Sequence, residues 1–206
     1  MRRGSAAHPA ASTRERILEA AIRRFARQSY EQTGLRDIAA DVGVDVAYVH
    51  RCFGSKEKLF AEAIRASVGP GRGIPNAATA DLAGALARQA LAREGRRSHR
   101  RIGPLDIAVR SLSSPKAASI LREYILDEFI TPLGARLREP AARRAALVAA
   151  LLAGLGILKD VLEIEPLRET AGGGLEQLVA SAITDMLGEP PMCGPPDAAG
   201  RERTAS

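Results

Sequence analysis

Residues 33–66 read TGLRDIAADVGVDVAYVHRCFGSKEKLFAEAIRA, and this stretch decides the predicted fold. Its apolar residues recur at intervals of three and four, which is typical of helices with one buried face. Gly43 supplies the tight backbone that ends a helix, and Asp45 is a good cap for the next one. The pattern predicts two short helices joined by a tight turn, at about 33–42 and 45–52, with a threonine cap on the first.

The segments on either side complete a three-helix unit. Upstream, Ser12 or Thr13 can cap a helix that runs to about Tyr30, and downstream Ser55 can cap another. Two short helices braced by a longer one form the helix-turn-helix that places its second helix in the major groove of DNA. The residues that we expect to hold this unit together are Ile38, Ala39, Gly43, Val44, Val49, Phe53 and Gly54. The outer face of the second helix then carries Val46, Ala47, Tyr48, His50 and Arg51.

The rest of the chain also has helical periodicity. The Gly/Pro-rich stretch VGPGRGIPN, residues 68–76, interrupts it, and further prolines and glycines divide the remaining sequence. Helices are expected at about 76–93, 104–113, 115–137, 140–162 and 175–187. The predicted fold class is all-α, with about nine helices: an amino-terminal three-helix head, residues 12–67, and a larger antiparallel helical bundle, residues 76–188. Residues 1–11 and 189–206 are expected to be disordered tails.

Charge and composition narrow the class of protein. The net charge is +6. Residues 1–66 hold 12 Lys and Arg against 8 Asp and Glu, a net charge of +4, so the first third of the chain is its more basic part. An excess of positive charge there suits a DNA-facing module. Aromatic residues make up 3% of the chain and Trp is absent, which argues against a surface that stacks sugars or single-stranded bases.

Several other classes of protein are disfavoured. His8, His50 and His99 lie in the tail, the head and a basic loop, so no catalytic histidine cluster is assembled, and we expect no enzyme. Cys52 and Cys193 match no metal or redox spacing, and we expect neither metal nor cofactor. The first residues lack the apolar segment of a signal peptide, and Ala145–Leu158 is too short to span a membrane. This apolar stretch is expected to be a buried helix of a cytoplasmic protein.

The head resembles the TetR family of bacterial regulators. The resemblance rests on TRERILEAAIRRFARQSY at 13–30, LRDIAADVGV at 35–44 and YVHRCFGSKEKLF at 48–60. Phe53 to Glu57 fits the aromatic residue followed by Gly-Ser-Lys-Glu that is typical of the family motif. The sequence departs from that pattern at His50, where the family usually has tyrosine, and at Val46, where a polar or basic residue is usual.

The resemblance implies a homodimer whose two heads bind a palindromic site on double-stranded DNA. It places Thr33 and Gly34 at a helix amino terminus that favours a phosphate, and Arg36 at a groove edge. It also implies that Lys56 holds a phosphate. With the recognition face, the expected DNA-binding residues are Thr33, Gly34, Arg36, Val46, Ala47, Tyr48, His50, Arg51 and Lys56. Because Val46 and Ala47 are apolar, readout there would depend on thymine methyl groups.

The resemblance further implies that the body binds a small-molecule effector. The long helices expected from Ala141 and Leu175 are apolar on more than one side, so we expect the homodimer to form through these last two long helices. The spacing of apolar residues suggests an effector cavity lined by Leu105, Val109, Leu112, Tyr124, Ile125, Phe129, Leu152 and Leu155, with the Tyr124 hydroxyl as its polar anchor. The expected function is a repressor that a small apolar or amphipathic effector releases from DNA. The alternative is a dimeric helical interaction or sensor protein that keeps the fold but has weak or no operator binding.

Overall fold

The computed structural model describes residues 12–68, 73–92, 102–167 and 173–188, and this part of the chain is helical without any strand. The two expected tails and the basic loop at 93–101 lie outside the described residues. The head consists of α1 (Thr13–Phe25), α2 (Leu35–Val42), α3 (Val46–Phe53) and α4 (Lys56–Val68). The body consists of α5 (Thr79–Leu91), α6 (Pro104–Ser111), α7 (Pro115–Ile125), η1 (Leu126–Ile130), α8 (Thr131–Gly134), α9 (Ala141–Gly156), η2 (Ile157–Val161), η3 (Glu165–Leu167) and α10 (Gly174–Leu187). The all-α prediction is confirmed.

Two of the long helices in the body contain a short π-helical segment. The segments α7, η1 and α8 follow one another without a break, and η2 continues α9 directly. The helix expected at 115–137 is therefore continuous, as predicted, but contains a π-helical segment at Leu126–Ile130. Such segments are uncommon and often lie at functional sites. If segments that follow one another without a break are counted as one helix and the short η3 is left out, the described residues form nine helices.

The core of the head is an aromatic cluster that ties α1 to α4. Phe25, Tyr30 and Phe60 are almost completely buried, and the Phe60 ring meets the other two edge-on, with centroid distances of 4.9 and 5.0 Å. α1 ends at Phe25, earlier than expected, and a turn carries the chain to Tyr30. These ring contacts pack α4 against the end of α1 and the turn that follows it.

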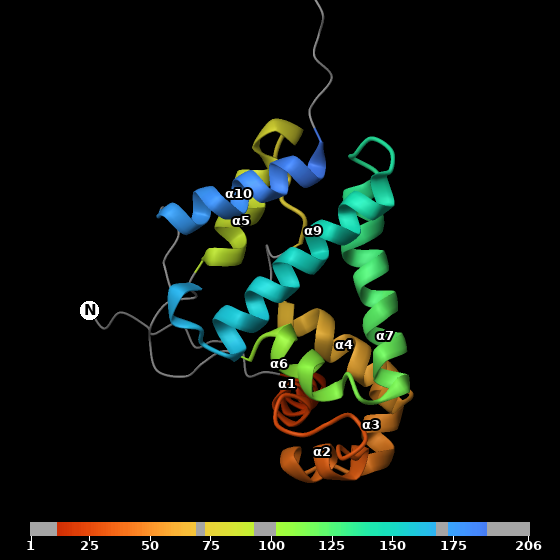
Figure 1. Ribbon diagram of the computed structural model, residues 1–206. Coiled ribbons are helices and arrows are strands. Elements are labelled where there is room, and N and C mark those ends of the chain that lie inside the picture. Colours follow the sequence, from red (N-terminus) through yellow and green to blue (C-terminus); the bar gives the residue numbers. More distant parts are fainter. Residues whose placement is uncertain (1–11, 69–72, 93–101, 168–172, 189–206) are drawn as a thin grey trace, which may run out of the picture.

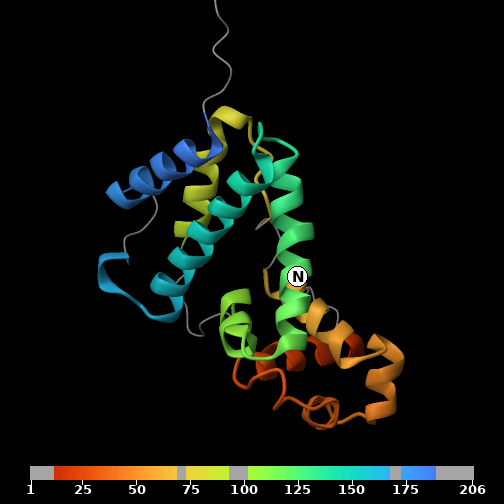
Figure 2. The same ribbon diagram turned by 45° about the vertical axis from the view of Figure 1, so that its right-hand side comes forward.

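The molecule has two hydrophobic cores, and they do not coincide with head and body. The first core contains the buried residues of α1–α4 together with Ile107 of α6 and Ala117 and Leu121 of α7. The second core lies at the far end and joins α5, α8, α9 and α10. In Figure 1 the head occupies one end of the molecule, α5 and α10 occupy the other, and α7 and α9 run between them. Figure 2, turned by 45°, again shows α5 and α10 side by side at the end away from the head. The helices α6 and α7 therefore share a core with the head and connect it to the body.

The apolar helix of the body differs from its sequence-based expectation. Within the described residues, the stretch Ala141–Val161 is long and apolar enough to span a bilayer, with 21 residues and a mean hydropathy of 1.7, yet only 17% of its most apolar window is buried. The expectation that Ala145–Leu158 is a buried helix is therefore wrong for the single chain. The reason is geometric. A cavity lies along one side of α9, and the described residues do not cover Leu147 of α9 or Leu158 of its continuation η2, which are 56% and 42% exposed.

Candidate nucleic-acid interface and body cavity

The tight turn between α2 and α3 has the predicted glycine geometry. Gly43 has a φ of 75°, in the left-handed region that other residues avoid. The amide of Val44 donates to the carbonyl oxygen of Ala39 at 3.0 Å, which closes the end of α2. Asp45 then caps α3, because its Oδ1 accepts a hydrogen bond of 2.6 Å from the Ala47 amide. The carboxylate of Asp45 is thus held by its own helix.

The outer face of α3 carries the expected recognition residues. Ala47, His50 and Arg51 are exposed, Val46 and Tyr48 are half-buried, and the intervening Val49 faces the core. The Arg51 guanidinium lies 5.3 Å from the centroid of the Tyr48 ring, so two of these side chains form a stacked pair. The face presents the Arg51 cation, the Tyr48 ring, the His50 imidazole and the short apolar groups of Val46 and Ala47.

The tautomer of His50 follows from its contact. Its Nδ1 lies 3.1 Å from the carbonyl oxygen of Gly54, the residue that ends α3. Since a carbonyl oxygen only accepts, Nδ1 must carry the proton. Nε2 is then the ring nitrogen not engaged in this contact, and His50 is oriented by the end of its own helix.

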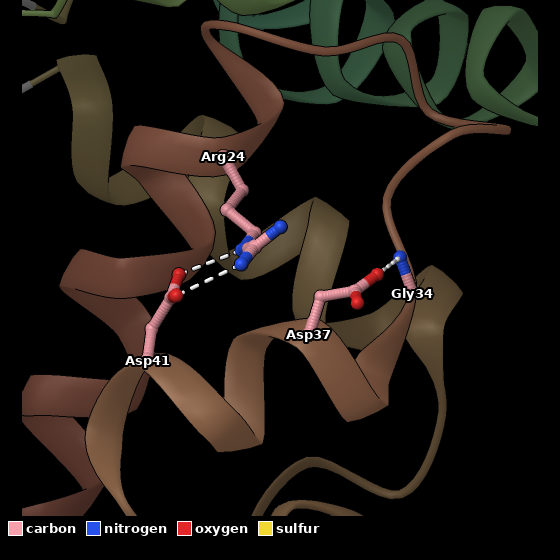
Figure 3. A network of polar contacts seen from close by, with 4 residues as sticks. All are labelled: Arg24, Gly34, Asp37 and Asp41. Atoms are coloured by element: carbon pink, nitrogen blue, oxygen red, sulfur yellow. Dashed lines mark hydrogen bonds and ion pairs between the residues drawn. The ribbon is translucent and has the colours of Figure 1, made fainter.

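The start of α2 differs from the prediction. The first cap is Gly34, not Thr33. Thr33 is completely buried, and both its amide and its hydroxyl donate to the Ser29 carbonyl oxygen, at 3.2 and 3.1 Å. The Gly34 amide donates to the Asp37 carboxylate at 3.0 Å (Figure 3). The Thr33 amide, which was expected to favour a phosphate, is thus already bonded within the head, and an anion at the Gly34 amide would have to displace the Asp37 carboxylate. Arg36, in contrast, is exposed.

Lys56 lies in an unexpected environment. Its Nζ is 4.2 Å from the centroid of the Tyr30 ring, in a cation–π arrangement on the aromatic core of the head. Burial lowers the pKa of Lys56, and the nearby carboxylates of Glu31 and Glu57 act in the opposite direction. The lysine thus stabilises the junction of α1 and α4, and a phosphate contact would be an additional role.

An ion pair fixes α2 against α1. Arg24 donates through its Nε and Nη2 atoms to the two carboxylate oxygens of Asp41, at 2.6 and 2.8 Å (Figure 3). The hydrogen bond from Arg24 holds the pKa of Asp41 below its ordinary value. Because α2 supports the recognition helix, this two-point contact helps set the orientation of α3.

We predict that Asp41→Asn destabilises the protein at neutral pH only. A lowered carboxyl pKa contributes stability that is present above the unfolded pKa and is lost as the pH falls through the folded one. Because solvent screens this partly exposed pair, we expect the unfolding free energy to drop by about 0.5–1 kcal/mol at pH 7. Urea unfolding at a series of pH values tests this. The difference should shrink as the pH falls below the ordinary aspartate pKa of about 3.9 and vanish once Asp41 is protonated in the folded protein as well. Asp127→Asn, at an exposed site on η1, is the matched control.

A cavity of about 740 Å³ lies between the two cores. Its wall is built mainly from α4 of the head and from α5, α6, α7, η1, α9 and η2 of the body. Of the residues expected from the sequence, five line it: Leu105, Tyr124, Ile125, Phe129 and Leu152. Burial raises the pKa of Tyr124, and the Glu128 carboxylate raises it further.

The other three expected cavity residues lie elsewhere. On α6 the buried stripe is centred on Ile107 and Ser111, so Val109 points to solvent, and Leu112 lies just beyond the end of the helix and is 58% exposed. Leu155 is on the opposite side of α9 from the cavity and packs in the second core. These placements correct the expectation for Val109, Leu112 and Leu155.

Sequence reasoning missed the part of the wall that comes from the head. Ile64, Arg65 and Val68, at the carboxyl end of α4, line the cavity. Arg65 donates through its Nε to the Glu128 carboxylate of η1 at 3.2 Å. These partners are separated by 63 residues along the chain, so no local pattern joins them. α4 therefore belongs both to the head core and to the cavity wall.

The fold and these two features define a class: a helix-turn-helix DNA-binding protein with a hollow helical body. Two family models match the chain: "Bacterial regulatory proteins, tetR family" over residues 17–63, and "Tetracyclin repressor-like, C-terminal domain" over residues 80–187. Together they cover most of the chain. The chain belongs to the TetR family of DNA-binding transcriptional regulators.

Solved structures agree with this fold. A TetR-family regulator from Streptomyces coelicolor A3 is 24% identical, with a TM-score of 0.57, and the match covers 89% of this chain and 99% of that one. GusR from Salmonella enterica is 19% identical with a TM-score of 0.61 and the same coverage. No curated protein sequence matches the chain. TetR-family regulators bind DNA and ligands and form homodimers.

Proposed function

We propose that this regulator is a repressor that a small apolar or amphipathic molecule releases from a palindromic operator. The observation that supports this most strongly is that α4 lines the cavity with Ile64, Arg65 and Val68 while its other residues build the head core. A molecule in the cavity would contact the helix that positions the head. Its binding would therefore change the distance between the two heads of a dimer. We expect the protein to act in the cytoplasm.

The proposed DNA interface is the outer face of α3 with Arg36 of α2. Arg36 supplies a fork of donors that suits the O6 and N7 atoms of guanine. We expect Tyr48, Arg51 and His50 to contact bases or backbone, and Val46 and Ala47 to meet thymine methyl groups. Gly34 and Lys56 remain proposed backbone contacts, although each is already engaged within the head.

A dimer through α9 and α10 is the second part of the proposal. α10 packs against α9 and α5. Three exposed leucines lie on these helices: Leu147 on α9, Leu158 on its continuation η2 and Leu178 on α10. An apolar helix that is mostly uncovered in one chain would promote aggregation unless a second surface covered it. A second copy of the same chain supplies that surface with closed symmetry.

Binding to duplex fragments from the neighbourhood of the protein's own gene tests the operator proposal. Saturable, salt-dependent binding with a preferred palindrome supports a repressor. Uniformly weak binding would favour the alternative, a dimeric sensor without an operator. That alternative is motivated by the apolar residues Val46 and Ala47 and by the burial of the Thr33 hydroxyl.

We predict that Arg36→Ala relaxes sequence choice. Loss of one bidentate base contact is expected to weaken binding to the preferred duplex by about tenfold to a hundredfold, and binding to scrambled duplexes much less. Fluorescence anisotropy with both duplexes measures the ratio. Arg122→Ala removes an exposed arginine of α7 in the body and should change neither affinity. An equal loss on both duplexes would show that Arg36 contacts only the phosphate backbone.

A further inference from the structure

The floor of the cavity is a stripe of small residues on α9. Ala146, Ala149, Ala150, Ala153 and Gly156 all line the cavity, and their spacing puts them on one side of the helix. At 1.5 Å per residue this stripe is about 15 Å long. Across from its lower end, the Leu105 side chain lies so close to Gly156 that a β-carbon there would clash with it. These small side chains make the α9 wall an apolar trough along which a narrow molecule can lie.

The charged groups in the cavity wall already have partners within the protein. Arg65 is paired with Glu128 at 3.2 Å, and Asp160 is paired with Lys159 at 2.8 Å. The side-chain amide of Gln89 donates through its Nε2 to the Gly73 carbonyl oxygen at 3.1 Å. An ionised ligand would have to give up its hydration and then compete with one of these contacts. An uncharged ligand has no such cost.

Tyr124 differs from the other polar residues of the wall. It is half-buried, and its hydroxyl makes no hydrogen bond to another residue of the described ranges, although Glu128 and Arg65 lie near enough to act on it electrostatically. It comes from α7, the helix that packs directly on α4. A hydroxyl in this position can both donate and accept.

We propose that the cavity selects an uncharged, elongated apolar molecule that carries a single hydrogen-bonding group, which the Tyr124 hydroxyl meets. The inference rests on the proposed function in that the cavity is the effector site. It adds the chemical class of the effector: neutral, chain-like or narrow, and polar at one point only. The trough gives the shape, the paired charges exclude ions, and Tyr124 gives the position of the polar group.

Three probes of equal chain length test the charge preference: 1-decanol, decanoate and decylammonium. Their binding to the full-length protein without DNA is measured by isothermal titration calorimetry at pH 7. We expect decanol to bind at least tenfold more tightly than either ion. Equal or tighter binding of an ion overturns the proposal, as does the absence of decanol binding up to its solubility limit.

Variants locate the site and its polar contact. Ala149→Leu fills the trough and should abolish decanol binding, whereas Glu123→Gln, at an exposed neighbour of Tyr124, should leave it unchanged. Tyr124→Phe is expected to weaken decanol about fivefold. Glu128→Gln removes the partner of Arg65, so decanoate should gain at least fivefold in affinity while decanol stays within twofold. Failure of decanoate to gain would contradict the role of the paired charges.

Release of a labelled operator duplex is measured separately with the same probes. If decanol binds in the trough but DNA stays bound, the proposed effector response fails and the ligand class stands. If an ion binds more tightly and releases DNA, the ligand class fails and the repressor function stands.

Discussion

Replacing Leu147 and Leu178 together with glutamate is expected to convert the proposed homodimer into monomers. These side chains are 56% and 71% exposed in the single chain and lie on α9 and α10. In a twofold dimer each substitution is present twice, so four apolar side chains leave the interface and four carboxylates enter it. At about 1.5–3 kcal/mol for each buried leucine, the dimer dissociation constant should rise by at least about a thousandfold, which corresponds to roughly 4 kcal/mol.

Sedimentation equilibrium measures this change directly, and operator affinity should fall with it because a monomer presents one head to a two-headed site. Gln177→Glu is the matched control, since it places the same charge on an exposed position of α10 beside Leu178. Circular dichroism checks that the double variant keeps its helices. A double variant that remains a dimer would place the interface on another surface.

Phe60→Ala is expected to destabilise the head by about 3–5 kcal/mol, the usual cost of removing a buried aromatic side chain. The Phe60 ring is completely buried and lies edge-on to Phe25 and Tyr30. Its removal leaves a void where α1 meets α4, the junction that also carries Lys56. Loss of this junction should reduce operator binding even though Phe60 itself makes no DNA contact in our proposal.

Urea unfolding followed by circular dichroism measures the destabilisation. Phe60→Leu is the graded control, because it keeps most of the apolar volume and should lose much less stability. Ser119→Ala, at an exposed position of α7, should change the midpoint little. A loss below about 1 kcal/mol for Phe60→Ala would mean that the cluster repacks around the void.

The head was predictable because its signals are local. Gly43 must adopt a positive φ, and Asp45 caps the next residues of its own helix, so the turn and the start of α3 follow from adjacent positions. Even there, local signals competed. Both Thr33 and Gly34 suit the start of a helix, and the choice was made by the buried bond from the Thr33 hydroxyl to the Ser29 carbonyl oxygen.

The sequence by itself therefore determined the helical class, the helix-turn-helix and the end of α4 at the Gly/Pro-rich stretch, since periodicity, caps and breakers act over a few residues. Only the tertiary structure decided which side of α9 faces the cavity, that Leu155 does not, and that Arg65 of the head meets Glu128 of the body. The physical reason is that both faces of α9 are apolar. Hydrophobicity alone cannot show whether an apolar face of α9 lines a cavity, packs in a core or is left for a second chain. The outcome depends on which other helices pack around α9.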